Sequence, residues 1–477
     1  MDLWYFGAAG VLSLCLVYPA YFACIHQTQI RLILRGKAVI KFVEAIRATL
    51  DLWLTHPSSH WLTTAFAGGT RVPMVETIAK TNELAKEIPT AAATRLPLPP
   101  PSLSIEDEDI DPTDATLTNT SNFCFLNATL HCLFRTPRFL NLLHRSMSAQ
   151  ERNLLGDAKE TCCWYLMQTG FTMKEEKGAC VDVVQLGLAT AMKACSTLIN
   201  MPEQDQQDAE ECLSFFLDIL NEATKVSPSK SLMTQDFHTV KSFLMHEIQA
   251  KSSLHPESYS DLVHHLASVA WDEYVLRNHS FITECFVGQI IRGSSCQFCK
   301  RLSCHLQEMS VLSLGLHTAS SAMSLESCLD HFKEIEEMQQ DNKIWCSQCQ
   351  DKTNHCIQSL LLRTPQCLVI QLKRFTYTSA VSGKNSAPVY FPVHRLNLSP
   401  YLFRRDSHVY YQLYAVCAHL GSTLGAGHYV AYCRLSSTNT TSQWLKYDDE
   451  IIKIVDEQTM LDETLHSAYL LFYERLS

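Results

Sequence analysis

The chain has 477 residues, of which 46% are hydrophobic and 18% charged, with 16 glycines and a formal net charge of −10 at pH 7. This length predicts two or three domains, or one large domain with extensions, and a core large enough to fold without disulfides. The composition excludes collagen-like, elastic and wholly disordered chains, and the acidic charge argues against a nucleic-acid partner. Twenty cysteines remain to be explained as disulfides, metal ligands or a reactive thiol.

The first predicted element is a membrane span. Residues 3–25 are 23 consecutive residues without a charge, and as a helix they would cross a hydrocarbon core of about 30 Å. A cleaved signal peptide is the alternative, but the stretch is long for one, and Asp2 replaces the usual basic residues. Basic residues follow from Arg31 to Arg47, so the positive-inside rule places the rest of the chain in the cytosol. We therefore expect residues 1–26 to be a transmembrane anchor in the endoplasmic reticulum or the mitochondrial outer membrane.

Residues 27–114 are predicted to join this anchor to the rest of the chain. Apolar residues recur among basic ones over residues 27–56, which is typical of an amphipathic helix on a membrane surface. A helix packed on the soluble domain fits the same pattern. Four prolines over residues 97–101 and an acidic run over residues 106–111 then indicate an extended, solvated linker.

From about residue 115 the pattern is first helical and then strand-like. Apolar residues have helical spacing over residues 209–219 and alternate over residues 366–375 and 410–416. We therefore expect an α+β fold with a helical half followed by a β-rich half. Because a disulfide framework is unfavourable in the cytosol, metal ligands, a nucleophile and buried apolar positions should share the cysteines.

Cys124 is the first candidate for a reactive thiol. It follows the polar loop 119–122 and precedes an apolar periodic run, so it is predicted to begin a helix, where the free N–H groups stabilise a thiolate. A cysteine in this position is more often structural when nothing else supports a reactive role. The support comes from His428, which follows a loop containing three glycines, and from the carboxylates of Asp448 and Asp449. A thiol early in the chain with His and Asp late is the order of papain-like cysteine hydrolases.

Two C-x-x-C pairs lie between these boxes. Cys296 with Cys299 and Cys346 with Cys349 are separated by 46 residues, and four thiolates in two such pairs suit a tetrahedral Zn²⁺. Four protein ligands leave no position for water, so this zinc is predicted to be structural. Cys304 is a nearby fifth cysteine that the sequence does not separate from the ligand set.

Six blocks in this order resemble the ubiquitin-specific protease family of deubiquitinases. They are the box around Cys124, Gln206–Glu211, the two C-x-x-C pairs, Cys367–Phe375, the box around His428, and Tyr447–Asp449. The resemblance covers residues 115–477 and implies a papain-like cysteine protease shaped as a hand. A helical thumb is expected over about 115–284, and a β palm with zinc-tied fingers over about 285–477.

The resemblance also implies the catalytic roles. Cys124 would attack the carbonyl of the C-terminal glycine of ubiquitin, and His428 would move the proton. Asp448 would orient His428, with Asp449 as a supporting polar group. Asn119 would donate to the oxyanion beside the Cys124 backbone N–H, and no cofactor is implied for catalysis.

The implied partners are ubiquitin and ubiquitinated proteins. Asp208 and Glu211 match acidic positions that meet the arginines of the ubiquitin tail. The chain departs from the family at Phe123, His131 and Glu210, and the ring of Phe123 beside the thiol would narrow the channel for that tail. A catalytically weak ubiquitin-binding scaffold and a protease for a ubiquitin-like modifier therefore stay as alternatives. Residues 222–284 exceed the family's shortest connection. They are interpreted as a helical surface addition, with an insertion that adds substrate or partner contacts as the alternative.

Overall fold

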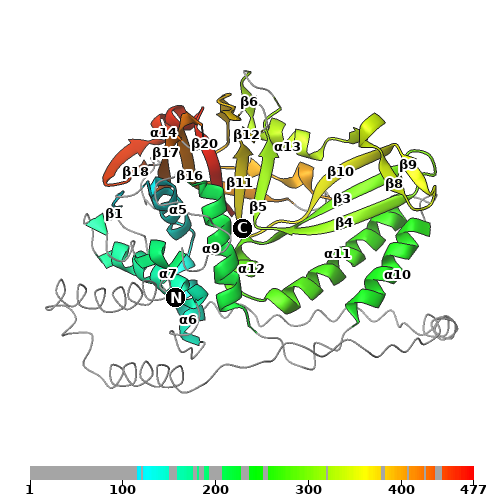
Figure 1. Ribbon diagram of the computed structural model, residues 1–477, viewed down its shortest axis with the longest axis horizontal. Coiled ribbons are helices and arrows are strands. Elements are labelled where there is room, and N and C mark those ends of the chain that lie inside the picture. Colours follow the sequence, from blue (N-terminus) through cyan, green and yellow to red (C-terminus); the bar gives the residue numbers. More distant parts are fainter. Residues whose placement is uncertain are drawn as a thin grey trace, which may run out of the picture. The chain divides into compact units, whose positions relative to one another are not determined.

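The computed structural model describes most of the chain from residue 115 onward (Figure 1). The described residues are 115–119, 122–149, 158–175, 180–181, 187–192, 207–226, 236–250, 256–317, 321–377, 382–404, 408–423, 426–435 and 443–476. The predicted anchor over residues 1–26 and the segment 27–114 lie outside them.

In the part of the chain that the structure describes, no helix is both long enough and apolar enough to cross a membrane.

The first part of the described chain is a helical subdomain, here called the thumb. Its helices are α5 (Cys124–Phe134), α6 (Phe139–Ala149), α7 (Ala158–Glu175), α9 (Ala209–Thr224) and α12 (Phe281–Phe286), beside the short parallel pair β1 (Thr116–Leu117) and β2 (Cys180–Val181). All residues of α5 are buried, because α5 packs between α9 and the neighbouring sheet. The helix predicted over residues 209–219 is confirmed and continues to Thr224 as α9.

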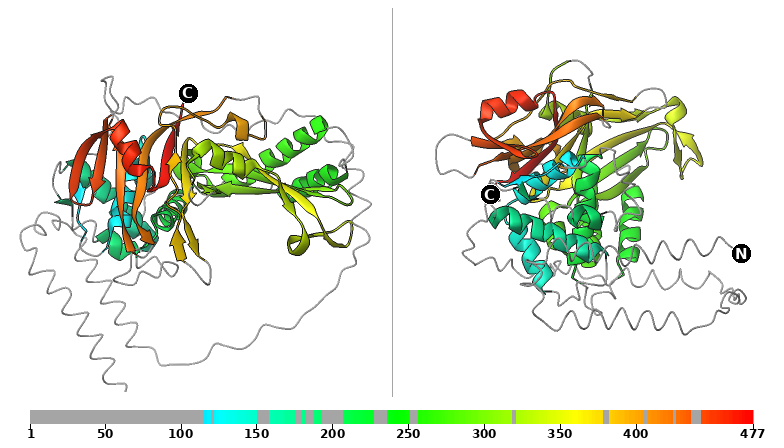
Figure 2. Two further views of the ribbon diagram at one scale, coloured as in Figure 1. Left: turned by 90° about the horizontal axis from the view of Figure 1, so that it is seen from above. Right: turned by 60° about the vertical axis from the view of Figure 1, so that its left-hand side comes forward.

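The palm is a sheet with strand order β19-β18-β17-β16-β20-β11-β5, in which β15 also pairs with β16 (Figures 1 and 2). Its strands are β5 (Val311–Gly315), β11 (Cys367–Lys373), β15 (Leu396–Asn397), β16 (Tyr410–Thr423), β17 (Ala426–Arg434), β18 (Gln443–Asp448), β19 (Ile451–Asp456) and β20 (Ala468–Arg475). Neighbours are antiparallel except β5 and β11. Ala431 and Cys433 of β17 share a core with the thumb, whereas Val430 and Tyr432 share one with Met460 of α14 (Glu457–Thr464). Both faces of the palm are therefore buried, as successive residues of a strand point to opposite faces.

The fingers are a second sheet, with order β4-β3-β10-β7. Its strands are β3 (Gly288–Cys296), β4 (Leu302–Met309), β7 (Glu336–Met338) and β10 (His355–Arg363), and the hairpin β8 (Ile344–Cys346) with β9 (Asp351–Thr353) lies beside it. Helices α10 (Phe237–Ala250) and α11 (Pro256–Asn278) run along this sheet (Figure 1). Leu244, Ile248, Val263 and Leu266 of these helices form a buried cluster with Ile291 of β3. The segment 222–284 is thus more than a surface addition, because it supplies a core for one face of the fingers.

The strand predicted over residues 366–375 is interrupted at Arg374. Strand β11 ends at Lys373, and β12 (Phe375–Tyr377) pairs instead with β13 (Ser382–Lys384). The Arg374 side chain is fully buried, and its guanidinium donates to the carbonyls of Ala387 and Ala468. These hydrogen bonds compensate the burial of the guanidinium and give both carbonyls a donor. The remaining elements are β6 (Met323–Ser324), α13 (Leu325–Lys333), β14 (Val389–Tyr390) and the short 3₁₀ turns Gln340–Asn342 and Ser399–Tyr401.

Candidate active site

Cys124 is the first residue of α5, and its side chain is 3% exposed. The N-cap residue, Phe123, has no polar side chain to cap the helix, and the first turn carries no acidic residue. The partial positive charge of the first amide groups therefore acts on the sulfur. Asn122 has φ 58° in the turn before the helix, a left-handed conformation that asparagine tolerates better than most residues. The prediction that Cys124 begins a helix after a polar loop is confirmed.

His428 lies near the start of β17, opposite Leu420 of β16. Its Nε2 is 2.6 Å from Asp448 Oδ1, and its ring also hydrogen-bonds the Cys124 thiol, for which Nδ1 is the remaining ring nitrogen. The bond to Cys124, and after it the bond to Asp448, outweigh partial burial and raise the pKa of His428 to about 9. The imidazole is therefore protonated at neutral pH, which is the form that pairs with a thiolate.

Asp449 has different partners from Asp448. Its backbone is left-handed, with φ 49°, and its Oδ2 lies 3.9 Å from His428 Nε2. The Asn119 amide donates to Asp449 Oδ2 and the Asn127 amide to Oδ1, each at 2.8 Å. The turn after β18 is thus bonded both to Asn119, before Cys124, and to α5, which Cys124 begins.

Asn119 and Asn127 lie on either side of Cys124 in the sequence. Asn119 accepts the Phe123 N–H at 2.7 Å, so both ends of its amide are held. Asn127 is 2% exposed and donates to the Thr118 carbonyl at 3.1 Å as well as to the Asp449 turn. Asn119 was a predicted site residue and Asn127 was not. Asn127 could have been found from its position three residues after Cys124, which places both on the same face of the helix.

The two acidic residues at the start of α9 differ in their surroundings. Asp208 caps the helix by accepting the Glu210 N–H at 2.7 Å, and its oxygens accept the Tyr469 hydroxyl at 2.8 and 2.7 Å. Burial raises the pKa of Asp208. Glu211 is exposed in the first turn. Glu211 is therefore open to a basic partner, whereas Asp208 joins the thumb to β20 of the palm.

The residues that depart from the expected pattern take part in packing. Phe123 is partly buried against the thumb core. His131 stacks on Tyr447 with ring centroids 3.8 Å apart, and burial lowers the pKa of His131 to about 3, so it is neutral. Glu210 accepts the Ser214 hydroxyl at 2.8 Å. Each of these side chains thus makes a packing contact or a hydrogen bond within the thumb or between the thumb and the palm.

The four cysteines of the two C-x-x-C pairs converge at the ends of β3 and β8. Their sulfurs all lie within 4.8 Å of one another, with 3.8 Å from Cys296 to Cys349 and 3.6 Å from Cys299 to Cys346. A tetrahedron with Zn–S distances near 2.3 Å has edges of about 3.8 Å, so the donor set fits zinc. Cys304 is not part of the cluster, because its thiol faces Met245 Sδ at 3.6 Å.

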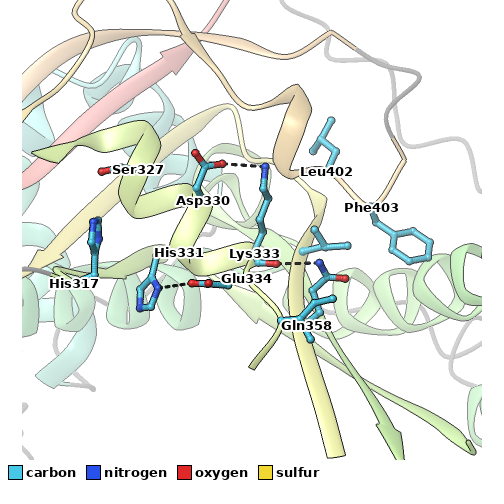
Figure 3. Close-up of a pocket in the computed structure, with 11 residues that line it drawn as sticks. His317, Ser327, Asp330, His331, Lys333, Glu334, Gln358, Leu402 and Phe403 are labelled. Atoms are coloured by element: carbon cyan, nitrogen blue, oxygen red, sulfur yellow. Dashed lines mark hydrogen bonds and ion pairs between the residues drawn. The ribbon is translucent and has the colours of Figure 1, made fainter. Parts of the chain in front are cut away.

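A separate surface pocket of about 630 Å³ lies between α13, β10 and the segment at Leu402 (Figure 3). Its charged side chains pair with one another: Asp330 with Lys333 at 2.9 Å, and His331 with Glu334 at 3.0 Å. None of its lining residues belongs to the site around Cys124.

Comparison with protein families and sequences gives consistent matches. Residues 115–473 match the model of the family described as ubiquitin carboxyl-terminal hydrolase. Ubiquitin carboxyl-terminal hydrolase Usp2 of Drosophila melanogaster is 31% identical over 368 residues, which cover 75% of this chain and 34% of that protein. Ubiquitin carboxyl-terminal hydrolase 21 of Homo sapiens is 28% identical over 363 residues, covering 75% of this chain and 61% of that protein. The chain therefore matches about a third to three fifths of the length of these relatives.

Solved structures share the fold. The SAGA DUB module of Ubp8, Sgf11, Sus1 and Sgf73 bound to monoubiquitin matches with a TM-score of 0.54 and 20% identity, covering 79% of this chain and 72% of that chain. A structure of the yeast SAGA DUB module with an Sgf73 mutant matches with a TM-score of 0.55 and 19% identity, over 78% of this chain and 71% of that chain. The mixed arrangement of helices and sheets is common to them.

Proposed function

This chain belongs to the ubiquitin carboxyl-terminal hydrolase family, and we propose that it is a thiol-dependent deubiquitinase that hydrolyses the isopeptide bond after the C-terminal glycine of ubiquitin. One observation carries the proposal: the Cys124 thiol contacts His428, whose Nε2 is held by Asp448. Nucleophile, base and orienting carboxylate in contact are what a thiol hydrolase requires. The names of the relatives support ubiquitin as the modifier.

In the proposed reaction the Cys124 thiolate attacks the glycine carbonyl carbon, a C–S bond forms, and an electron pair moves to the oxygen. As this intermediate collapses, the C–N bond breaks and the His428 imidazolium gives its proton to the leaving lysine amine. Neutral His428 then takes a proton from water, whose oxygen attacks the thioester carbon. The C–S bond breaks, the carboxyl group of ubiquitin is released and the Cys124 thiolate is restored beside the His428 imidazolium. Asp448 keeps Nε2 occupied, so that Nδ1 faces the sulfur.

The oxyanion formed in both steps is assigned to Asn119 and the Cys124 backbone N–H. One N–H of the Asn119 amide donates to Asp449, which leaves the second N–H to donate to the oxyanion. Asn127 fixes the other oxygen of Asp449 and so supports the orientation of Asn119. Loss of one oxyanion donor typically costs about 10²–10³ in rate.

The basic ubiquitin tail is assigned to the start of α9. Glu211 is exposed there and is the proposed contact. Asp208 keeps its predicted place in the tail site, and its bonds to Tyr469 and to the Glu210 N–H give it the further role of fixing the helix start.

We also assign a structural Zn²⁺ to the cluster of Cys296, Cys299, Cys346 and Cys349, on the fit of its sulfur separations. When bound, the ion would hold two strand ends together and take no part in the hydrolysis.

The test of the function is capture by a ubiquitin whose C-terminus carries an electrophile. We expect the full chain in detergent to gain the mass of one ubiquitin and the Cys124→Ala variant to gain none. Cys356→Ala is the control, because this cysteine is more accessible than Cys124 and lies away from it, on β10 of the fingers. The measurement is intact-protein mass spectrometry.

Two other outcomes would replace the proposal by one of its alternatives. Ubiquitin that binds the wild-type chain without forming an adduct would favour a catalytically weak scaffold. An electrophile on a ubiquitin-like modifier that reacts faster than the ubiquitin probe in direct competition would change the modifier.

The membrane anchor is a further part of the proposal, supported by the 23 uncharged residues from Leu3 to Ile25 and the basic residues after them. The described domain would then face the cytosol at the endoplasmic reticulum or the mitochondrial outer membrane.

Deleting residues 1–26 is expected to move the protein from the membrane fraction to the soluble fraction and to leave hydrolysis of a small ubiquitin amide unchanged. Fractionation and a fluorogenic assay check both parts. Loss of activity on deletion would mean that the segment belongs to the fold, and alkaline extraction of the full chain would contradict a span.

A further inference from the structure

The proposed catalytic histidine, His428, lies near the tip of the hairpin formed by β16 and β17. At this tip the other edge of β16 is no longer paired with β20. The pairing of β16 with β20 ends at Ala418 opposite Ala468, whereas the pairing of β16 with β17 continues past Leu420, which faces His428. Beyond Ala418, backbone groups of β16 that point away from β17 have no strand to bond among the described residues. His419 is buried there, so its carbonyl is costly to leave unpaired, whereas Gly421 is exposed.

Lys384, at the end of β13, takes the place of the missing strand. Its Nζ donates to the carbonyl of His419 and, at 3.0 Å, to the carbonyl of Gly421. These residues flank Leu420, and alternate residues of a strand present their backbone groups to the same edge. The His419 N–H on this edge donates to the Ser467 carbonyl at 2.8 Å. One ammonium group thus bridges the carbonyls on either side of Leu420, the residue that pairs with His428 across the hairpin.

The side chain of His419 packs on one face of the hairpin near the same tip. It is fully buried, and a Cβ on Gly427 would lie 2.4 Å from its Cε1 and Nε2. The ring therefore packs directly on the residue before His428. Phe375 and Tyr429 contact the ring edge-on, with centroids 5.1 and 4.7 Å away. Any shift of the β16 edge at His419 would consequently move this ring and Gly427 with it.

We propose that Lys384 is a positioning residue for the catalytic histidine: by bridging the carbonyls of His419 and Gly421 it keeps the tip of the β16–β17 hairpin, and hence His428, in contact with Cys124 and Asp448. This inference rests on the proposed hydrolase function. A displacement of a catalytic group by about 1 Å can cost 10²-fold in rate, so a loosened hairpin tip should lower kcat and leave substrate binding intact.

The test is Lys384→Met in the full chain, which keeps the aliphatic side chain and removes the donors. We expect kcat for a fluorogenic ubiquitin amide to fall about 10- to 100-fold with little change in KM. Lys384→Arg should restore most of kcat, because a guanidinium can also donate to two carbonyls. Lys333→Met is the matched control: this lysine is also half-buried, pairs with Asp330 at 2.9 Å and lies over the Tyr401 ring.

A second readout needs no ubiquitin. The rate at which iodoacetamide alkylates Cys124, followed by peptide mass spectrometry, reports the contact of the thiol with His428 and should fall in Lys384→Met but not in Lys333→Met. Unchanged kcat and unchanged alkylation would overturn the proposal, as would losses that merely follow a lower melting temperature and that Lys384→Arg does not restore. If the wild-type chain hydrolyses no ubiquitin amide, the proposed function fails, and the alkylation rates still decide the role of Lys384.

Discussion

Replacing His428 with alanine is expected to lower kcat for a ubiquitin amide by about 10²–10⁴-fold, the usual contribution of general acid–base catalysis. The imidazole bonds Cys124 and Asp448, so its loss removes both the partner of the Cys124 thiolate and the acid for the leaving amine. KM should change little, because His428 has no assigned contact with the ubiquitin body. Steady-state kinetics with a fluorogenic ubiquitin amide measures both constants.

The pH dependence of kcat in the wild-type chain tests the same role of His428. The raised pKa of His428, about 9, means that the folded state favours the protonated ring. The stability that this contributes is complete below pH 6.5 and is lost as the pH rises through about 9. Because the protonated ring is the proposed acid for the leaving amine, kcat should fall over the same upper range.

The matched control for His428→Ala is His394→Ala, at an exposed histidine that pairs with Glu457 at 3.0 Å. This variant should keep wild-type kcat and the same basic limb. A His428→Ala variant with more than a tenth of wild-type kcat would contradict the assigned role, as would a wild-type rate that keeps rising above pH 9.

Removing the proposed zinc is expected to destabilise the fingers strongly. The four sulfurs join the ends of β3 and β8, and 46 residues separate Cys299 of the first pair from Cys346 of the second. Binding energy at a structural zinc site is folding energy, with apparent values of about 10–16 kcal/mol in zinc-finger peptides. Cys349→Ser, or a strong chelator, should therefore lower the melting temperature and reduce the zinc content from one ion per chain. Calorimetry and elemental analysis measure these quantities.

Cys304→Ser is the control for the metal site, because this thiol lies near the cluster in sequence but faces Met245. It should keep both the zinc and the melting temperature. A chain purified without zinc, whose melting temperature neither chelation nor Cys349→Ser changes, would refute the assignment.

Much of the site could be predicted from sequence because its signals are local. The polar loop and the apolar run around Cys124 predicted the start of α5. The C-x-x-C spacing places the two cysteines of each pair in one turn, and the fold then brings the two pairs together. The helix at residues 209–219 followed from its apolar spacing. Such patterns depend on residues within a few positions of one another, so a sequence shows them directly.

Contacts between distant residues were decided by the tertiary structure. Asn127 donates to Asp449, 322 positions away, and Tyr469 holds Asp208 across 261 positions. Periodicity shows which face of a helix or strand is buried but not which distant side chain it will meet, and this explains why neither the contact of Asp208 with Tyr469 nor that of Asn127 with Asp449 was predicted.

The sequence by itself predicted Cys124, His428 and Asp448 as one group, the four clustered cysteines and the order of a helical and a β-rich half. The tertiary structure alone decided how these groups are held: Asp449 between two asparagines, the α10–α11 pair against the fingers, and Lys384 on the edge of β16. The physical reason is that chemistry is carried by residue type at short spacing. The orientation of each group depends instead on where strands end and which buried polar atoms then need a partner.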